Sequence, residues 1–138
     1  MSEANSSGSG LTPTVTLDPL LLPTFTLHHE VQGHEVVVRL RGNADSDVAT
    51  AFGRYLEQLH HEIVAAKATH LTFDFRELYF LTSACIECLV LAIKRVVAMD
   101  SRFQYKVRLL TTPALRWQER SFEVLYQMAP TLVTRSTD

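Results

Sequence analysis

The sequence predicts a single α/β domain, a mixed β-sheet with helices packed on it. Segments that alternate between apolar and polar residues are interleaved with segments whose apolar residues recur at steps of three and four, in the order β-β-α-β-α-β-α. Size agrees with this fold class, because 138 residues with 46% hydrophobic and 20% charged residues fit one core. A core of this size needs no disulfide or structural metal for stability.

The first two strands are expected to form a hairpin. Residues 25–31 and 35–41 have the alternating pattern of strands, and the short link between them contains Gly33, as tight turns do. Before the hairpin, residues 17–23 are apolar but include two prolines. This pattern favours an extended segment that covers part of the core.

A helix and a third strand follow the hairpin. Asp45, Ser46 and Asp47 are all suitable caps for the start of the helix. Its apolar face is expected to consist of Val48, Phe52, Tyr55, Leu56, Leu59 and Ile63. Residues 70–75 alternate again, and we expect this strand to run parallel to a neighbour because a helix separates it from the second strand.

Two more helices and a fourth strand complete the chain. After a short apolar segment at residues 78–81, an almost continuously apolar helix is expected from Ala84 to Met99. The fourth strand covers residues 105–110. Thr112 followed by Pro113 has the form of an N-cap and a proline at the first helical position, so the last helix is predicted to begin there.

Composition and charge argue against a nucleic-acid-binding or membrane-spanning protein. A net charge of −2, a pI near 6.3 and the lack of any Lys/Arg cluster argue against nucleic acid as a partner. Residues 1–12 are rich in Ser and Gly and predict a disordered tail, which leaves residues 13–135 as the domain. No secretory signal and no apolar run of the ~18 residues of a membrane span is visible, so a cytoplasmic location is expected.

The element order and two motifs resemble the STAS domain family of anti-sigma factor antagonists, from about residue 24 to residue 130. Residues 41–45, Arg-Gly-Asn-Ala-Asp, are similar to the family's Gly-x-Leu-Asp before the first helix. Residues 74–86, Asp-Phe-Arg-Glu-Leu-Tyr-Phe-Leu-Thr-Ser-Ala-Cys-Ile, resemble its Asp-Leu-Ser-x-Val-x-Phe-Ile-Asp-Ser-Ser-Gly-Leu. The resemblance implies a mixed sheet with helices and a regulatory role in signalling.

The second motif bears on regulation. Ser83 takes the position of the family's regulatory phosphorylated serine, which makes Ser83 the phosphorylation candidate and Thr82 the second one. Thr82, Ala84 and Cys85 stand where the family has Asp, Ser and Gly, which favours a non-phosphorylated scaffold as the close variant. A hydroxyl at this helix start could also serve simply as a cap for unpaired N–H groups.

The sequence therefore predicts a protein-interaction module and not an enzyme, without cofactor or metal. The implied partners are a serine kinase or anti-sigma-like protein, or copies of itself in a sensory assembly or homodimer. We expect the docking surface to combine the loop after the second strand with the start of the apolar helix. Its candidate residues are Asn43, Asp45, Thr82, Ser83, Ile86, Glu87 and Val90.

Other chemistries remain as alternatives. Cys85 and Cys88 stand at a helix start, where a thiol redox pair would lie, but they also extend an apolar stripe and fit the core. The same helix start could bind a small anion or nucleotide. The six histidines show no metal-ligand spacing.

Overall fold

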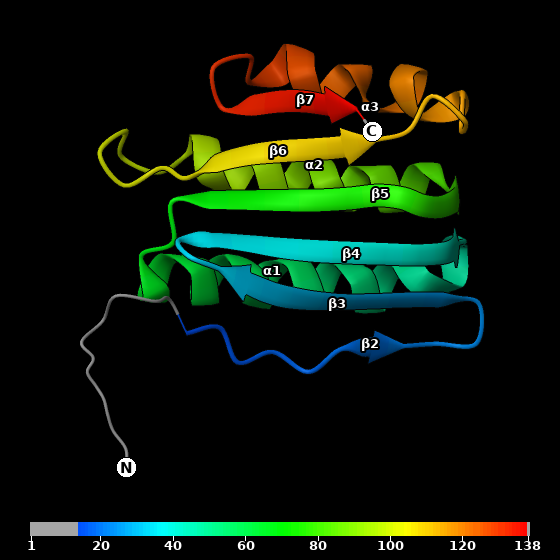
Figure 1. Cartoon of the computed structure of the whole chain (residues 1–138), viewed down its shortest axis with the longest axis horizontal. Helices are drawn as coiled ribbons and strands as arrows, with labels where there is room; N and C mark the ends of the chain where they lie inside the picture. The colour runs from blue at the N-terminus through cyan, green and yellow to red at the C-terminus, as the bar shows by residue number, and fades with distance from the viewer. Residues whose placement is uncertain (1–13, 138) are drawn as a thin grey trace.

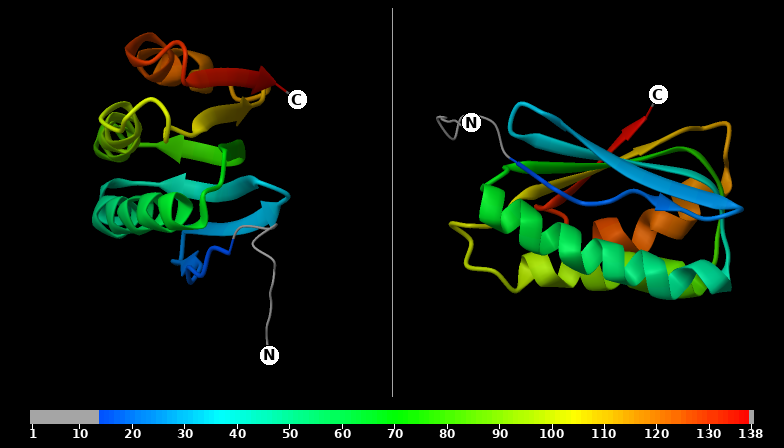
Figure 2. Two further views of the ribbon diagram at one scale, coloured as in Figure 1. Left: turned by 90° about the vertical axis from the view of Figure 1, so that its left-hand side faces the viewer. Right: turned by 90° about the horizontal axis from the view of Figure 1, so that it is seen from below.

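A computed structural model describes residues 14–137 and shows a sheet with helices on one face only (Figures 1 and 2). The described strands form one six-stranded sheet in the order β2-β3-β4-β5-β6-β7. Their bounds are β2 Leu20–Leu21, β3 Phe25–Gln32, β4 Glu35–Ala44, β5 His70–Leu81, β6 Lys106–Thr111 and β7 Val133–Thr137. The tail predicted at residues 1–12 lies outside the described residues.

The predicted hairpin is confirmed. β3 and β4 pair antiparallel from Phe25↔Gly42 to Gln32↔Glu35, and Gly33 in the turn has a φ of +64°, which glycine adopts at little cost. Ahead of the hairpin, the apolar segment lies along β3, where Leu20 pairs with Leu27. The extended path predicted for this segment is thus correct.

Three crossover helices connect the parallel part of the sheet. β4, β5, β6 and β7 run parallel, and α1 (Ala49–Ala66), α2 (Ser83–Val97) and α3 (Trp117–Met128) all lie on the same side of the sheet (Figure 2). The short 3-10 turn η1 (Ser46–Val48) precedes α1. No described helix has the length and apolar character to span a membrane.

The core lies between the sheet and the helices. Alternate residues of β3, β4, β5 and β6 point toward the helices, and the face predicted for the first helix is buried as expected. Phe75 on β5 stacks on Phe122 of α3 at 4.4 Å between ring centroids, and Phe25 meets Phe52 edge-on at 5.9 Å. Such aromatic pairs add to the stabilisation that burial of their area provides.

The structure differs from the prediction most clearly at β5, α3 and β7. β5 is one strand through to Leu81, since a bulge absorbs the break in alternation after Phe75. α3 begins at Trp117 and not at Thr112–Pro113, because the Thr112 hydroxyl accepts from the Ala114 N–H and residues 113–116 form turns. β7 was not predicted, because its polar sequence shows only Val133 buried.

Candidate functional site

The two segments expected to form the docking surface lie side by side. β4 and β5 end together, with Asn43 opposite Phe80 and Ala44 opposite Leu81. Beyond the strands, the Thr82 N–H donates to the Ala44 carbonyl at 3.0 Å, and the Cys85 thiol donates to the Asp45 carbonyl at 3.5 Å. The start of α2 is therefore fixed against the loop that leads to α1.

Gly42 gives this loop its path. Its φ is +100°, and a Cβ there would lie 2.3 Å from the Thr24 carbonyl oxygen. This close approach lets the Asn43 N–H donate to the same oxygen at 2.8 Å and shifts the pairing of β4 with β5. As a result, Asn43 is exposed at the end of the sheet.

Asp45 has a structural role in the same loop. Its Oδ1 accepts from the Asp47 N–H at 3.1 Å and so caps η1, as the sequence predicted for one of three residues. The side chain is half-buried, while Asn43 beside it is exposed. Of the two loop residues proposed for docking, Asn43 is thus the more accessible.

The start of α2 exposes Ser83. Thr82 is the N-cap residue, but its side chain makes no capping hydrogen bond; its carbonyl accepts from the Cys85 and Ile86 N–H groups, each at 3.0 Å. Simple capping by a hydroxyl is therefore not the role of Thr82. Ser83 is exposed in the first turn, whereas Thr82 is half-buried.

The rest of the predicted surface is mixed in character. Glu87 is exposed, one turn after Ser83, while Ile86 and Val90 are half-buried and pack against the core. Sequence reasoning missed the exposed apolar residues nearby: Tyr79 is 56% exposed, Phe80 48% and Leu91 52%. Tyr79 and Phe80 are accessible because β6 pairs with β5 only as far as Asp74, a long-range feature without a local signal.

Both cysteine thiols donate hydrogen bonds to backbone carbonyls at the start of η1 and α1. The Cys88 thiol donates to the Ala49 carbonyl at 3.4 Å, and Cys85 is fully buried. Burial raises the pKa of both thiols. A redox cysteine needs a lowered thiol pKa, so these surroundings argue against the thiol alternative.

The histidines do not converge. Within residues 14–137, no group of three His, Cys, Asp or Glu side chains could hold a metal ion. His29 Nε2 lies 2.8 Å from the Val15 carbonyl oxygen, and His60 Nδ1 lies 2.7 Å from the Tyr105 hydroxyl. These two are structural contacts far from the start of α2.

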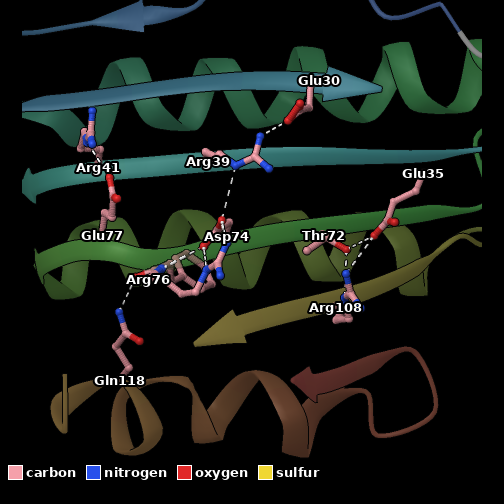
Figure 3. A network of polar contacts seen from close by, with 11 residues as sticks. Glu30, Glu35, Arg39, Arg41, Thr72, Asp74, Arg76, Glu77, Arg108 and Gln118 are labelled. Atoms are coloured by element: carbon pink, nitrogen blue, oxygen red, sulfur yellow. Dashed lines mark hydrogen bonds and ion pairs between the residues drawn. The ribbon is translucent and has the colours of Figure 1, made fainter. Parts of the chain in front are cut away.

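A charged network on the helix-free face of the sheet was also missed (Figure 3). Its centre is Asp74, only 6% exposed, which accepts from Arg76 Nε at 3.0 Å and Nη2 at 2.9 Å. Arg39 Nε lies 3.5 Å from the same carboxylate and also pairs with Glu30. Burial alone would raise the pKa of Asp74, but the hydrogen bonds and charge of Arg76, with the charge of Arg39, lower it below its usual value.

Comparison with known proteins gives matches among solved structures alone. No protein-family model and no curated protein sequence matches the chain. An anti-sigma factor antagonist from Mycobacterium paratuberculosis superposes with a TM-score of 0.59 at 17% identity, over 83% of this chain and 90% of that one.

Two other solved structures are similar with lower scores. The antisigma-factor antagonist STAS domain from Rhodobacter sphaeroides has a TM-score of 0.47 at 14% identity, over 63% of this chain and 86% of that one. The anti-sigma factor antagonist SpoIIAA in its unphosphorylated form has a TM-score of 0.48 at 21% identity, over 81% of this chain and 89% of that one. At these identities the likeness concerns the fold. The superposition with the Mycobacterium paratuberculosis structure shows that the chain shares the fold of that anti-sigma factor antagonist, a STAS-like mixed sheet with helices packed on it.

Proposed function

We propose that this chain is a protein-interaction module of a bacterial partner-switching or sensory signalling system, and not an enzyme. The observation that carries the proposal is the accessible start of α2, with Ser83 and Glu87 exposed, held against the end of β4, where Asn43 is also exposed. The STAS fold, shared with an anti-sigma factor antagonist, supports a protein as the partner. A serine kinase or anti-sigma-like protein is the partner that this resemblance favours.

The docking surface suits a macromolecule more than a small substrate. It combines a helix terminus, small polar groups and exposed aromatic rings at Tyr79 and Phe80. Aromatic side chains bury a large area at interfaces with few rotatable bonds, while the polar groups fix orientation. A homodimer and a cytoplasmic location are compatible proposals.

We further propose Ser83 as the residue on which a switch would act, with Thr82 second. A phosphate on Ser83 would bring about −1.5 to −2 charges to the start of α2, where the helix dipole stabilises an anion. The same charge would stand one helical turn from Glu87 and change the surface that a partner contacts. Partner affinity is therefore expected to depend on the state of Ser83.

Intact-mass analysis of the protein from its native host, with and without phosphatase, tests for the modification. The expected result is one species heavier by ~80 Da, the mass of one phosphate, that is lost in the Ser83→Ala variant. The control is Ser101→Ala, in an exposed turn away from α2's start, which should retain the species. If no heavier species exists, the non-phosphorylated scaffold, favoured by Thr82, Ala84 and Cys85 in the motif, replaces the switch.

Docking itself is tested by charge reversal. Glu87→Arg should abolish retention of the native partner in affinity purification, whereas Glu57→Arg, on the exposed side of α1, should retain it. Replacing both cysteines by Ala should leave partner retention unchanged. Equal retention by the Glu87 and Glu57 variants would show that the start of α2 is not the docking surface.

A further inference from the structure

A groove crosses the helix-free face of the sheet and includes none of the docking residues. It has a volume of about 670 Å³ and is lined by residues from β2, β3, β4 and β5 and by Thr112 after β6. This size is in the range of small-molecule sites.

Three arginines line the groove. Arg39, Arg41 and Arg76 face two lining carboxylates, Asp74 and Glu77, while Glu30 pairs with Arg39 from outside the lining. His28 and Thr112 add groups that can donate hydrogen bonds. With Glu30 included, three carboxylates balance the three guanidinium groups, and the groove is rich in N–H donors.

Arg39 and Arg76 are held in place before any ligand arrives. The buried carboxylate of Asp74 takes two hydrogen bonds from Arg76 and a contact from Arg39 at 3.5 Å (Figure 3). Side chains that are already fixed lose less conformational entropy when they bind, so such an arrangement favours affinity.

A bulge in β5 gathers these groups. The pairing moves from Arg39↔Asp74 to Arg41↔Glu77, so three residues of β5 match two of β4. As a consequence both Arg76 and Glu77 line the groove, although a regular strand would place neighbours on opposite faces.

Arg41 offers the most accessible donors. Its side chain is 68% exposed, and its ion pair with Glu77 uses Nε, at 2.6 Å from Oε1 (Figure 3). The two terminal nitrogens lie outside that pair, and a guanidinium presents them as a fork that matches the oxygens of a phosphate or carboxylate.

We propose that this groove binds a small molecule through an anionic phosphate or carboxylate group held by Arg41 and Arg39. The site goes beyond the proposed docking function and shares none of the docking residues. Glu77 competes with the ligand for Arg41. Loss of the Arg41 charge should therefore weaken ligand binding, and loss of the Glu77 charge should strengthen it.

The test uses inorganic phosphate and citrate as probes, titrated into the full chain at constant ionic strength set with chloride. Amide NMR shifts that saturate and cluster on β4, β5 and Thr112 are expected for at least one probe. Binding by phosphate alone assigns a phosphate ligand, and binding by citrate alone assigns a carboxylate. Failure of both probes to saturate any shift at about 10 mM, where even a weak millimolar site fills, overturns the proposal.

Matched variants sharpen the result. Arg41→Gln should weaken binding by about 10-fold or more, the usual effect of losing a charge-assisted hydrogen bond. Glu77→Gln should strengthen it, and Arg54→Gln, exposed on α1, should leave it unchanged. Thermal melts confirm that each variant is folded. If Arg41→Gln and Arg54→Gln bind alike, the groove is only a network of surface ion pairs.

Discussion

The ionisation of His60 links the stability of the fold to pH. It lies at the contact of α1 with Tyr105, and its pKa is lowered by burial and by the neighbouring charges of His61 and Arg95. Because the folded pKa is below the unfolded one, the folded state favours neutral His60. Its contribution to stability is present above the unfolded pKa and is lost as pH falls through the folded pKa.

We therefore expect the free energy of unfolding to decrease as pH falls below about 6.5, the usual pKa of histidine. The His60→Gln variant keeps a polar partner for Tyr105 but cannot titrate, so its stability should fall less over the same pH range. Urea unfolding at several pH values measures both, with His34→Gln, in the exposed turn between β3 and β4, as the control. Parallel pH profiles for the wild type and His60→Gln would contradict this role.

At the scale of elements, helix faces were predictable and strand ends were not. The α1 face from Phe52 to Ile63 follows from local spacing, and all its members are buried. The end of β5 and the start of α3 depend on a bulge and on the hydroxyl of Thr112, which compete with the local pattern. Propensity and periodicity report neither the pairing register that produces the bulge nor a local side-chain hydrogen bond such as that of Thr112.

The end of β4 depends on Gly42. Gly42→Ala adds a Cβ 2.3 Å from a backbone oxygen at a φ of +100°, so we expect a loss of about 2–4 kcal/mol of stability. Gly33→Ala is the matched control, because it also has positive φ but nothing within 4 Å of the added Cβ, and should cost only about 1 kcal/mol. Denaturant unfolding separates the two; equal losses would mean that the close approach to Thr24 is unimportant.

At the scale of the whole molecule, Gln118 connects α3 to β5. It is 0% exposed and donates to the carbonyls of Phe75, at 2.6 Å, and Leu78, at 3.2 Å, where β6 no longer pairs with β5. Its Oε1 accepts from the Thr112 N–H at 3.1 Å. One amide thus satisfies three backbone groups that a neighbouring strand would otherwise have to pair.

Gln118→Leu keeps the size of the side chain and removes these bonds, so it should reduce the free energy of unfolding by about 2–4 kcal/mol. Gln127→Leu, whose amide bonds the exposed Glu123 on the same helix, should change it by no more than about 0.5 kcal/mol. The urea midpoints of the Gln118 and Gln127 variants, each compared with that of the wild type, measure the two losses of stability. A Gln118 variant as stable as the Gln127 variant would show that solvent can replace the amide.

The docking surface could be predicted from the sequence, whereas the charged groove could not. The meeting of Asn43 with the start of α2 followed from the STAS resemblance, and the fold confirms that they are adjacent. The charged groove could not be predicted, because Arg39 and Asp74 are brought together by strand register across the whole of α1. Only the assembled sheet shows that these scattered charges share a site.

Gly42 has a final consequence for communication across the protein. It is the single residue between Arg41, which lines the groove, and Asn43, which belongs to the docking surface. A rotation of its peptide planes would reorient the neighbours on both sides at once. A change of the backbone at Gly42 would therefore disturb the groove and the docking surface together.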